Sequence, residues 1–472
     1  MSLATLWRFL AVALPVFAAL IANLPSVDLT YHLRAGHEIL TTGSIPRTDS
    51  WTFTVYGEPW FDQQWGAQAL LAAIEMVAGW TGLVLFRALL VGFVFGSLAF
   101  IVRRRGLADR TSTLLALAAF FVAAPALALR PELLGLACFT VVLLLVSDRR
   151  HHPRGLWAIP LVVAVWANLH GSFFLGPLVV GLAWMEDLHD RVPRPNQTLA
   201  VALIAALAAC LTPFGPLVWI YALGLSTNPE VTSRVSEWQP TSLRDVPGAL
   251  FFASVLGVVA VLARRGRVIP WPTLLWLLVF FGLGVYAIRG VTWWPLAATV
   301  AIAGLVGSGM SDRMQVRTEP ALGRRINAAI TVLLVVVGVV ILPIWRPVDA
   351  GTGTPAGVVS FAPPGVTEAL HDLVRPGDRI FNPQRWGSWF EYALPAAFVA
   401  VDSRIEIFPA AVWDDYESVA AGTDGWVQRL EAWAVDIVVT DRSQESLGDR
   451  LEVSGWTQVY ADADGGIYVV SD

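Results

Sequence analysis

The sequence predicts an α-helical polytopic membrane bundle of about eleven spans, followed by a C-terminal α/β extracytoplasmic domain. Of the 472 residues, 56% are apolar and only 15% are charged, whereas about a quarter of the residues in a soluble protein carry charge. All 32 basic residues are Arg; they outnumber the acids up to residue 346, and the acids outnumber them beyond it. We therefore expect a membrane domain at 1–346, a Gly- and Pro-rich linker at 347–366 and a water-exposed domain at 367–472. The net charge of −5 argues against nucleic-acid binding.

The membrane spans are predicted from long apolar runs, because a helix that crosses a bilayer needs about 20 apolar residues. Two further stretches are interrupted by turn residues. We expect 156–185, broken at Asn168-Leu169-His170-Gly171, to form a hairpin of two short spans, and 199–225, broken at Pro213-Phe214-Gly215-Pro216, to cross once. The uninterrupted runs are 3–24, 81–102, 111–129, 132–147, 249–263, 270–288, 291–309 and 327–345.

The loop charges select this choice of spans and an orientation, because Arg favours the cytoplasmic side. With eleven spans, six loop Arg lie outside: 34, 47, 130, 234, 244 and 289. Seventeen lie inside: 8, 103, 104, 105, 110, 149, 150, 154, 191, 194, 264, 265, 267, 313, 317, 324 and 325. The N-terminus is therefore predicted inside and the C-terminal domain outside.

The first outer loop, residues 25–80, gathers many polar side chains. Within it, 27–42 is predicted as a helix that ends at Gly43. Its apolar stripe has helical spacing and consists of Leu29, Leu33, Gly36 and Leu40. Asp28 and His32 are four residues apart, so they share one face of that helix. A short hairpin at 51–62 and an amphipathic helix at 63–79 are expected to follow.

The other outer turns carry few but notable polar groups. They are Arg130-Pro131-Glu132, the turn that contains His170, and Arg289 between two apolar runs. Ionisable residues at membrane depth are costly unless they line a cavity or meet a partner. We expect these groups and Asp28 to surround one outward-facing cavity.

Each of these residues also has an ordinary structural interpretation, and the sequence leaves both open. Asp28 could be a solvated carboxylate favoured by the helix dipole, and His32 a packing histidine at the interface. His170 could cap helix ends at a tight turn. Arg130 and Arg289 could extend to headgroup phosphates.

The C-terminal domain is predicted to alternate strands with helices, which is typical of an α/β layer arrangement. Strands are expected near 378–382, 397–401, 436–440, 456–461 and 466–470, and helices near 366–374, 386–393, 411–421, 425–434 and 444–453. Asp402, Arg404 and Glu406 alternate along a segment predicted to be extended, so they would face one side. They are interpreted as a structural ion-pair cluster or, alternatively, as groups that help to receive an acceptor.

Three strings resemble a known group of proteins. VDLTYHLRAGHEILTTGSIPRTDSWTFTVYGEPWFDQQW (27–65) resembles the first outer loop of bacterial multi-spanning proteins in the GT-C glycosyltransferase superfamily. WANLHGSFFLG (166–176) and DSRIEIFPAAVWDDY (402–416) resemble later landmarks of the same uncharacterised bacterial group. The resemblance touches both predicted regions and implies a GT-C-like bundle in the bacterial cytoplasmic membrane.

The resemblance also implies an activity: transfer of a sugar from a polyprenyl-phosphate carrier on the outer leaflet, as in protein mannosyltransferases, aminoarabinose transferases and arabinofuranosyltransferases. In that superfamily an acidic residue of the first outer loop is the catalytic base or helps to hold a divalent metal, and Asp28 matches it. Many members carry a second acid beside it, whereas Asp28 is followed by Leu29 and Thr30. This departure weakens a metal-site interpretation.

The chemistry of such a transfer fits the residues at hand. A base must take the proton of the acceptor hydroxyl, and cations must hold the departing phosphate, a task suited to the planar guanidinium of Arg. We therefore predict Asp28 as the catalytic residue, with substrate-binding residues His32, Arg34, Arg130, Glu132, His170 and Arg289. The expected partners are a lipid-linked sugar donor, a glycan, lipid or protein acceptor, and membrane lipids.

Two other functions are weighed against this one. A non-catalytic membrane protein of the same architecture, binding lipid carriers during envelope assembly, is favoured by the missing second acid. A secondary transporter fits less well, because transporters place ionisable residues at mid-membrane in both halves, whereas these polar groups belong to one face.

Overall fold

The computed structural model describes residues 1–264, 269–307, 320–423 and 425–470. The predicted inward residues Arg265, Arg267, Arg313 and Arg317 lie outside these ranges. The chain divides into two compact units. The first unit is Met1–Ala22, Val84–Thr227 and Val235–Leu342, and the second is Asn23–Leu83, Asn228–Arg234 and Pro343–Asp472.

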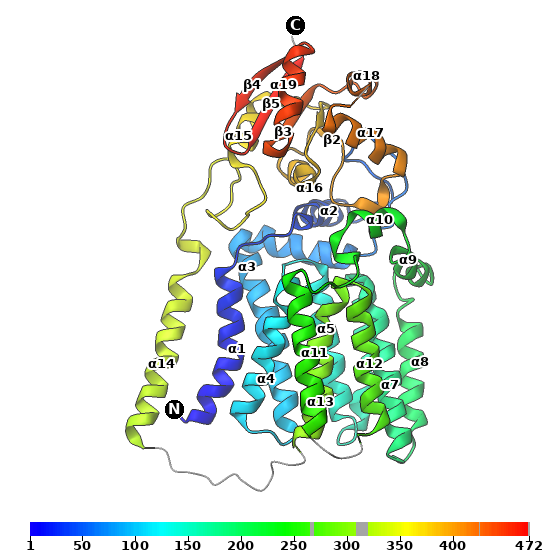
Figure 1. The fold of residues 1–472 in the computed structure, drawn as a ribbon, viewed down its shortest axis with the longest axis vertical. Helices are drawn as coiled ribbons and strands as arrows, with labels where there is room; N and C mark the ends of the chain where they lie inside the picture. Colours follow the sequence, from blue (N-terminus) through cyan, green and yellow to red (C-terminus); the bar gives the residue numbers. More distant parts are fainter. Residues whose placement is uncertain (265–268, 308–319, 424, 471–472) are drawn as a thin grey trace. The chain divides into compact units, whose positions relative to one another are not determined.

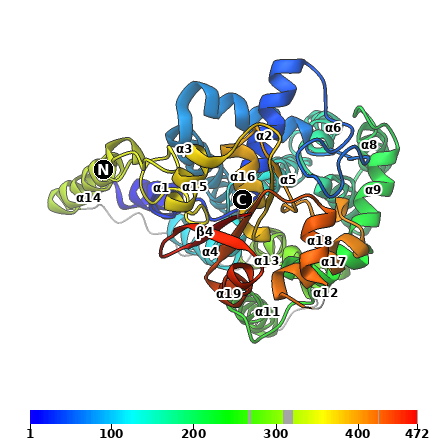
Figure 2. The ribbon, with the colours of Figure 1, turned by 90° about the horizontal axis from the view of Figure 1, so that it is seen from above.

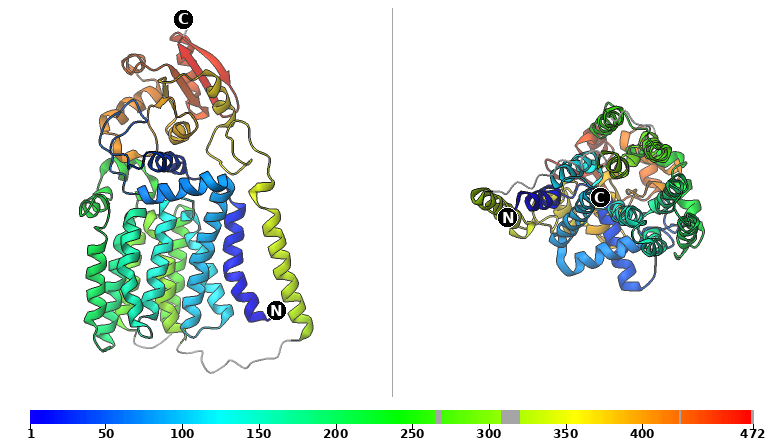
Figure 3. Two further views of the ribbon diagram at one scale, coloured as in Figure 1. Left: turned by 180° about the vertical axis from the view of Figure 1, so that it is seen from behind. Right: turned by 90° about the horizontal axis from the view of Figure 1, so that it is seen from below.

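The first unit is a bundle of helices that run side by side (Figures 1 and 3). Besides the C-terminal part of α3 (Trp65–Arg104), it contains α1 (Leu3–Ile21), α4 (Asp109–Ala123), α5 (Pro131–Asp148), α6 (Ile159–Leu169), α7 (Leu175–His189), α8 (Asn196–Ala208), α9 (Leu217–Leu225), α11 (Val246–Arg264), α12 (Trp271–Tyr286), α13 (Trp294–Gly307) and α14 (Ala321–Val340). Among the described residues, six helices are long and apolar enough to cross a membrane, and three shorter helices are also apolar. The chain is thus a multi-pass membrane protein, and the number of eleven spans stays a prediction.

Both interrupted runs break where the sequence predicts. In the first, α6 ends at Leu169 and α7 begins at Leu175, with a short 3-10 turn at Gly171–Phe174 between them. In the second, α8 and α9 are separate helices on either side of the Pro-rich turn. The long helix α3 is interrupted at Gly79, whose φ of 59° and ψ of −162° are non-helical, so an N-terminal segment precedes the apolar run.

The second unit contains a five-stranded mixed sheet in the order β2-β1-β3-β5-β4. Strands of this sheet are labelled in Figure 1, and β4 is also labelled in Figure 2. The strands are β1 (Arg379–Phe381), β2 (Phe398–Val399), β3 (Ile437–Asp441), β4 (Trp456–Ala461) and β5 (Gly465–Val470). β1 pairs in parallel with β2 and β3, whereas β5 pairs antiparallel with β3 and β4. The accompanying helices are α15 (Pro364–Leu373), α16 (Gln384–Ala393), α17 (Ala410–Ala421), α18 (Trp426–Ala432) and α19 (Glu445–Val453). The predicted alternation of strands and helices is confirmed.

Residues 25–80, predicted as the first outer loop, belong to this second unit. Their helix α2 (Asp28–Thr42) ends at Gly43, whose φ of 69° is left-handed, as the sequence predicts. Leu29 and Leu33 of the predicted apolar stripe are fully buried within the protein, whereas Leu40 is 45% exposed.

The same loop also extends the sheet. The Phe53 amide donates to the Val399 carbonyl at 3.1 Å, and the Val399 amide donates to the Trp51 carbonyl at 3.2 Å. Residues 51–53 therefore satisfy backbone groups at the edge strand β2, which would otherwise offer an unpaired edge.

Candidate functional site

Arg130 and Arg289 meet at one acidic residue of the first unit. Arg130 immediately precedes α5; its Nη2 lies 2.7 Å from Glu132 Oε2 and its Nη1 lies 2.6 Å from Glu237 Oε1. The Arg289 Nε lies 3.6 Å from Glu237 Oε2. Arg130 and Arg289, both predicted to bind phosphate, thus come from distant segments to the same carboxylate. The predicted cavity requires these two residues to lie close together.

The two carboxylates of this cluster differ in access. Glu132 is 1% exposed and accepts a hydrogen bond of 3.4 Å from the Thr292 hydroxyl. Glu237 is 33% exposed. Burial raises the pKa of Glu237, but the charges of Arg130 and Arg289 outweigh it, so its pKa is lowered overall. Glu237 is therefore an ionised carboxylate that solvent can reach.

Arg289 has an aromatic platform as well as its ion pair. Its guanidinium lies 5.0 Å from the centre of the Trp238 ring, within the range of a cation–π interaction. Arg289 stands in a short 3-10 segment, Ile288–Thr292, between α12 and α13. The turn between two apolar helices places this side chain at the end of the bundle rather than inside it.

His170 performs a structural task in the same unit. It ends α6, and its Nδ1 accepts a hydrogen bond of 3.2 Å from the Ser172 amide at the start of the next turn. A Cβ placed on Gly135 of α5 would lie 3.2 Å from the same Nδ1. The capping interpretation of His170 is therefore confirmed, and the ring packs against the helix that Arg130 begins.

Asp28 belongs to the second unit, where it is the first residue of α2. It is half-buried. A second carboxylate, from Glu406, lies near it: burial, followed by the negative charges of Asp402 and Asp28, raises the pKa of Glu406. The negative charge of Asp28 is thus felt at a carboxylate of the C-terminal segment, and a joint role of the two acids stays a prediction.

His32 lies one turn after Asp28 and is 2% exposed. Its Nδ1 is 3.4 Å from the Gln68 Nε2, which donates to Asp62 Oδ1 at 2.7 Å. Burial raises the pKa of Asp62 to about 7. These residues form a buried polar chain, so the packing interpretation describes His32 better than direct contact with a substrate.

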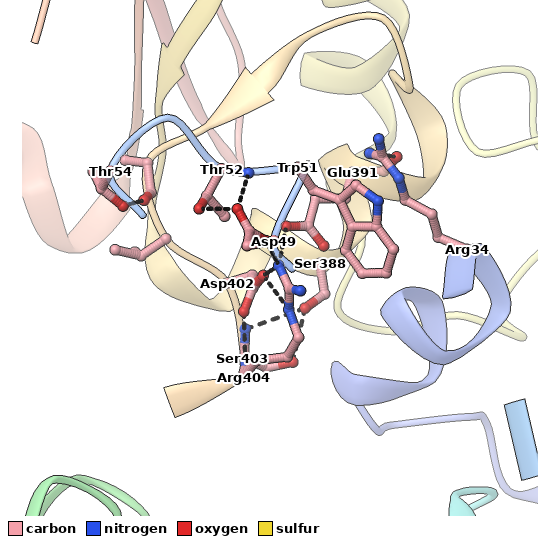
Figure 4. Close-up of polar contacts among 12 residues, drawn as sticks. Arg34, Asp49, Trp51, Thr52, Thr54, Ser388, Glu391, Asp402, Ser403 and Arg404 are labelled. Carbon is pink, nitrogen blue, oxygen red and sulfur yellow. Dashed lines mark hydrogen bonds and ion pairs between the residues drawn. The ribbon is translucent and has the colours of Figure 1, made fainter. Parts of the chain in front are cut away.

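Arg34 also makes internal contacts. Its Nη1 donates to the Glu391 carbonyl at 2.6 Å, and its guanidinium lies 5.0 Å from the Trp51 ring centre (Figure 4). Both partners belong to the second unit. Arg34 therefore helps to fix α2 against α16 and the loop at Trp51.

Arg404 is the centre of a buried ionic cluster (Figure 4). It is 1% exposed and forms ion pairs with Asp402, with Asp49 at 2.6 Å and with Glu391 at 3.5 Å. The Trp51 and Trp60 ring centres lie 4.4 and 4.6 Å from its guanidinium. The predicted structural ion-pair cluster is confirmed for Asp402 and Arg404, whereas the place of Glu406 in it stays a prediction. The alternative of an acceptor-receiving Arg404 is wrong because that side chain has no access to solvent.

The backbone expected around this cluster is different from the prediction. β2 ends at Val399, and Ile405–Ile407 form a 3-10 turn, so 402–406 is not an extended segment. Asp402 instead turns back on the chain, accepting a hydrogen bond of 2.6 Å from the Arg404 amide. This local carboxylate–backbone bond, typical of Asp in turns, explains the departure.

Several partners were missed by sequence reasoning. Glu237 and Asp49 are single acids in loops, and nothing in their local pattern shows which Arg they contact. Glu391 lies next to Phe390 on an apolar face of α16, and both side chains are fully buried. An acid within an apolar face is the one signal in the sequence that could have indicated a buried cation.

A dedicated metal site is not formed by the residues that the structure describes. No group of three His, Cys, Asp or Glu side chains gathers there with the arrangement needed to hold a metal ion. A site with only one or two carboxylates takes its remaining ligands from water and substrate phosphates, so a divalent metal at Asp28 stays a prediction.

Comparison with solved structures identifies the architecture. The chain aligns over 99% of its length with 74% of the apo oligosaccharyltransferase of Archaeoglobus fulgidus, with a TM-score of 0.56 and 12% identity. The fold is AglB-like. The archaeal oligosaccharyltransferase AglB of the same organism was also solved with an inhibitory peptide and a dolichol-phosphate (TM-score 0.59, 13% identity, 99% of this chain and 74% of that one). A third AglB structure contains Zn and sulfate (TM-score 0.57, 13% identity, 100% and 73%).

The likeness to AglB is one of fold alone at this level of identity. No family model matches the sequence, and no curated protein matches it either. The structural alignment nevertheless covers 99% of this chain.

Proposed function

We propose that this protein is a membrane glycosyltransferase that moves a sugar from a polyprenyl-phosphate carrier to a glycan, lipid or protein acceptor on the outer face of the bacterial cytoplasmic membrane. The meeting of Arg130 and Arg289 at Glu237 carries the proposal, because two guanidinium groups at a bundle end suit a phosphate. The AglB-like fold supports it, since AglB was solved with a dolichol-phosphate.

In the proposed reaction the acceptor hydroxyl oxygen attacks the anomeric carbon of the carried sugar. The carbon–oxygen bond to the acceptor forms as the bond to the carrier phosphate breaks, and the phosphate oxygen keeps the bonding electrons. Asp28 takes the hydroxyl proton as general base. Polyprenyl phosphate is the leaving group, and the guanidinium groups of Arg130 and Arg289 stabilise its negative charge.

Arg130 and Arg289 are the proposed ligands of the carrier phosphate. Before the carrier binds, Glu132 and Glu237 balance their charges, which spares two cations from standing unpaired near a bilayer. Glu237 is the more exposed of the two acids, so we propose that a phosphate displaces it. The side chains of four other predicted substrate-binding residues already make contacts within the protein: His32, Arg34, Glu132 and His170. Their direct contact with a substrate stays a prediction.

The phosphate role is tested by carrier binding in proteoliposomes that contain the full chain. Arg130→Gln and Arg289→Gln should each weaken polyprenyl-phosphate binding about tenfold, the value of one charge-assisted contact. Arg244→Gln, an exposed arginine of an outer loop, is the matched control and should leave binding unchanged. Equal binding by all three variants would contradict the proposal.

A non-catalytic carrier-binding protein is the second candidate. The absence of an acidic neighbour beside Asp28 in the sequence favours it. It predicts that the wild-type protein binds the carrier through the same arginines but never transfers the sugar to any acceptor pool. Release of polyprenyl phosphate with formation of a glycosylated acceptor would exclude it.

A further inference from the structure

A cavity of about 650 Å³ opens at the other end of the first unit, away from the turns that hold Arg130 and Arg289. It lies where α3, α5 and α7 end, where α12 begins and where α13 ends. This volume is within the range of pockets that hold small ligands. The predicted topology places this end at the cytoplasmic leaflet.

The polar part of the cavity wall holds four arginines, Arg104, Arg105, Arg149 and Arg150, together with three histidines and the acids Asp148, Glu186 and Asp190. Acidic residues fix most of the arginines in place. Arg149, which is 4% exposed, pairs with Glu186 at 2.8 Å and Asp187 at 2.9 Å, and Arg150 pairs with Asp190 at 2.7 Å.

Arg105 differs from these neighbours. Arg104 pairs with Asp148 at 3.1 Å, but within the described ranges no acid lies within ion-pair distance of Arg105. Burial and the positive charges of Arg149 and Arg150 lower the pKa of Arg105, although Glu186 opposes them. A cation held near two fixed cations is a favourable place for an anion.

The remainder of the wall is apolar and belongs to helices of the bundle. Phe100 and Ile101 of α3, Leu144 and Leu145 of α5, and Val300 of α13 contribute to it. A water-soluble anion gains nothing from these side chains. A phospholipid would use both parts, because its phosphodiester can meet Arg105 while its acyl chains cover the apolar wall.

We propose that this cavity binds the headgroup of an anionic phospholipid, with Arg105 as the principal phosphate ligand. Basic pockets between membrane helices on the cytoplasmic side commonly bind such lipids. The site is separate from the proposed sugar-transfer residues, so its occupancy is measured without any transfer assay.

The test is lipid binding to the delipidated full chain in detergent, measured by native mass spectrometry with phosphatidylglycerol, phosphatidylcholine or inorganic phosphate. Wild type should bind phosphatidylglycerol at least about tenfold more tightly than phosphatidylcholine, and Arg105→Gln should remove that preference. Arg110→Gln is the matched control: Arg110 lies outside the cavity, with its guanidinium 5.8 Å from the Trp7 ring, and the variant should bind as wild type does.

A second variant narrows the cavity without removing charge. A Cβ on Gly304 would lie 3.7 Å from the Arg105 Nη1, an ordinary contact, so Gly304→Val should fold and bind less phosphatidylglycerol. Unchanged binding in both Arg105→Gln and Gly304→Val would overturn the proposal. Equal binding of both lipids by wild type would overturn it too, and so would full competition by inorganic phosphate, which would indicate a free-phosphate site.

Discussion

The Arg404 Nη2 lies 2.6 Å from the Asp49 Oδ1, and both side chains are almost completely buried. This contact ties residues 25–80, the predicted first outer loop, to the C-terminal segment within the second unit. Asp49 also accepts hydrogen bonds from the Thr52 amide at 3.0 Å and the Thr52 hydroxyl at 2.7 Å (Figure 4). The cluster therefore holds the segment that pairs with β2.

Removal of Asp49 should destabilise the protein. Asp49→Ala leaves a buried guanidinium with fewer counter-charges, and breaking such a pair costs about 3 kcal/mol or more. Thermal unfolding in detergent measures the loss. The control is Asp415→Ala. Asp415 and Arg429 form an ion pair in which the side chains are 44% and 34% exposed, respectively, and such an exposed pair is expected to contribute less than about 1 kcal/mol. Similar losses in both variants would refute a special role for the buried cluster.

Stability should depend on pH through Asp62. Its pKa is raised from 3.8 to about 7 by burial, so between these values the unfolded chain loses a proton that the folded protein keeps. The stability that the protonated Asp62 contributes is fully present below pH 3.8 and is lost as the pH rises through about 7. The melting temperature of Asp62→Asn, measured relative to that of wild type, should therefore rise between pH 5 and pH 8. A constant difference across that range would show that Asp62 titrates normally.

Arg130 and Arg289 should act on the carrier as a coupled pair, because both contact Glu237. In a double-mutant cycle of Arg130→Gln and Arg289→Gln, the losses in polyprenyl-phosphate binding should differ from additivity by more than about 0.5 kcal/mol. Isothermal titration with each variant gives the coupling. Strict additivity would mean that the two arginines bind independently.

His170 should tolerate a residue that caps a helix. Because its Nδ1 accepts from the Ser172 amide, His170→Ala should lose about 1 kcal/mol of stability. His170→Asn, which retains an acceptor, should keep most of the stability and the transfer activity. If His170→Asn remains stable but loses transfer, the histidine has a chemical role beyond capping.

Much of the fold was predictable because its signals are local. Apolar runs place the membrane helices, and the Gly and Pro breaks near His170 and Pro213 separate α6 from α7 and α8 from α9. The helix from Asp28 to Thr42 is set by its polar start and by Gly43. Periodicity predicts the apolar face of this helix, but it does not predict that the protein covers Leu29 and Leu33 and leaves Leu40 exposed.

The candidate site was predictable only in part, because ion pairs between distant segments leave no local pattern. The outer turns identify Arg130 and Arg289, but their meeting depends on Glu237 from a third segment. In the same way, Glu406 comes close to Asp28 only through the folding of the second unit. The residue types could be read from the sequence, whereas their partners required the three-dimensional arrangement.

The most direct test of the central claim measures carrier binding and sugar transfer in parallel for Asp28→Asn, with Glu58→Gln, an exposed acid of the same loop, as the control. Loss of a general base should lower the transfer rate by about 10²- to 10⁴-fold, while polyprenyl-phosphate binding and melting temperature remain those of wild type. Transfer by Asp28→Asn at the wild-type rate would contradict the account.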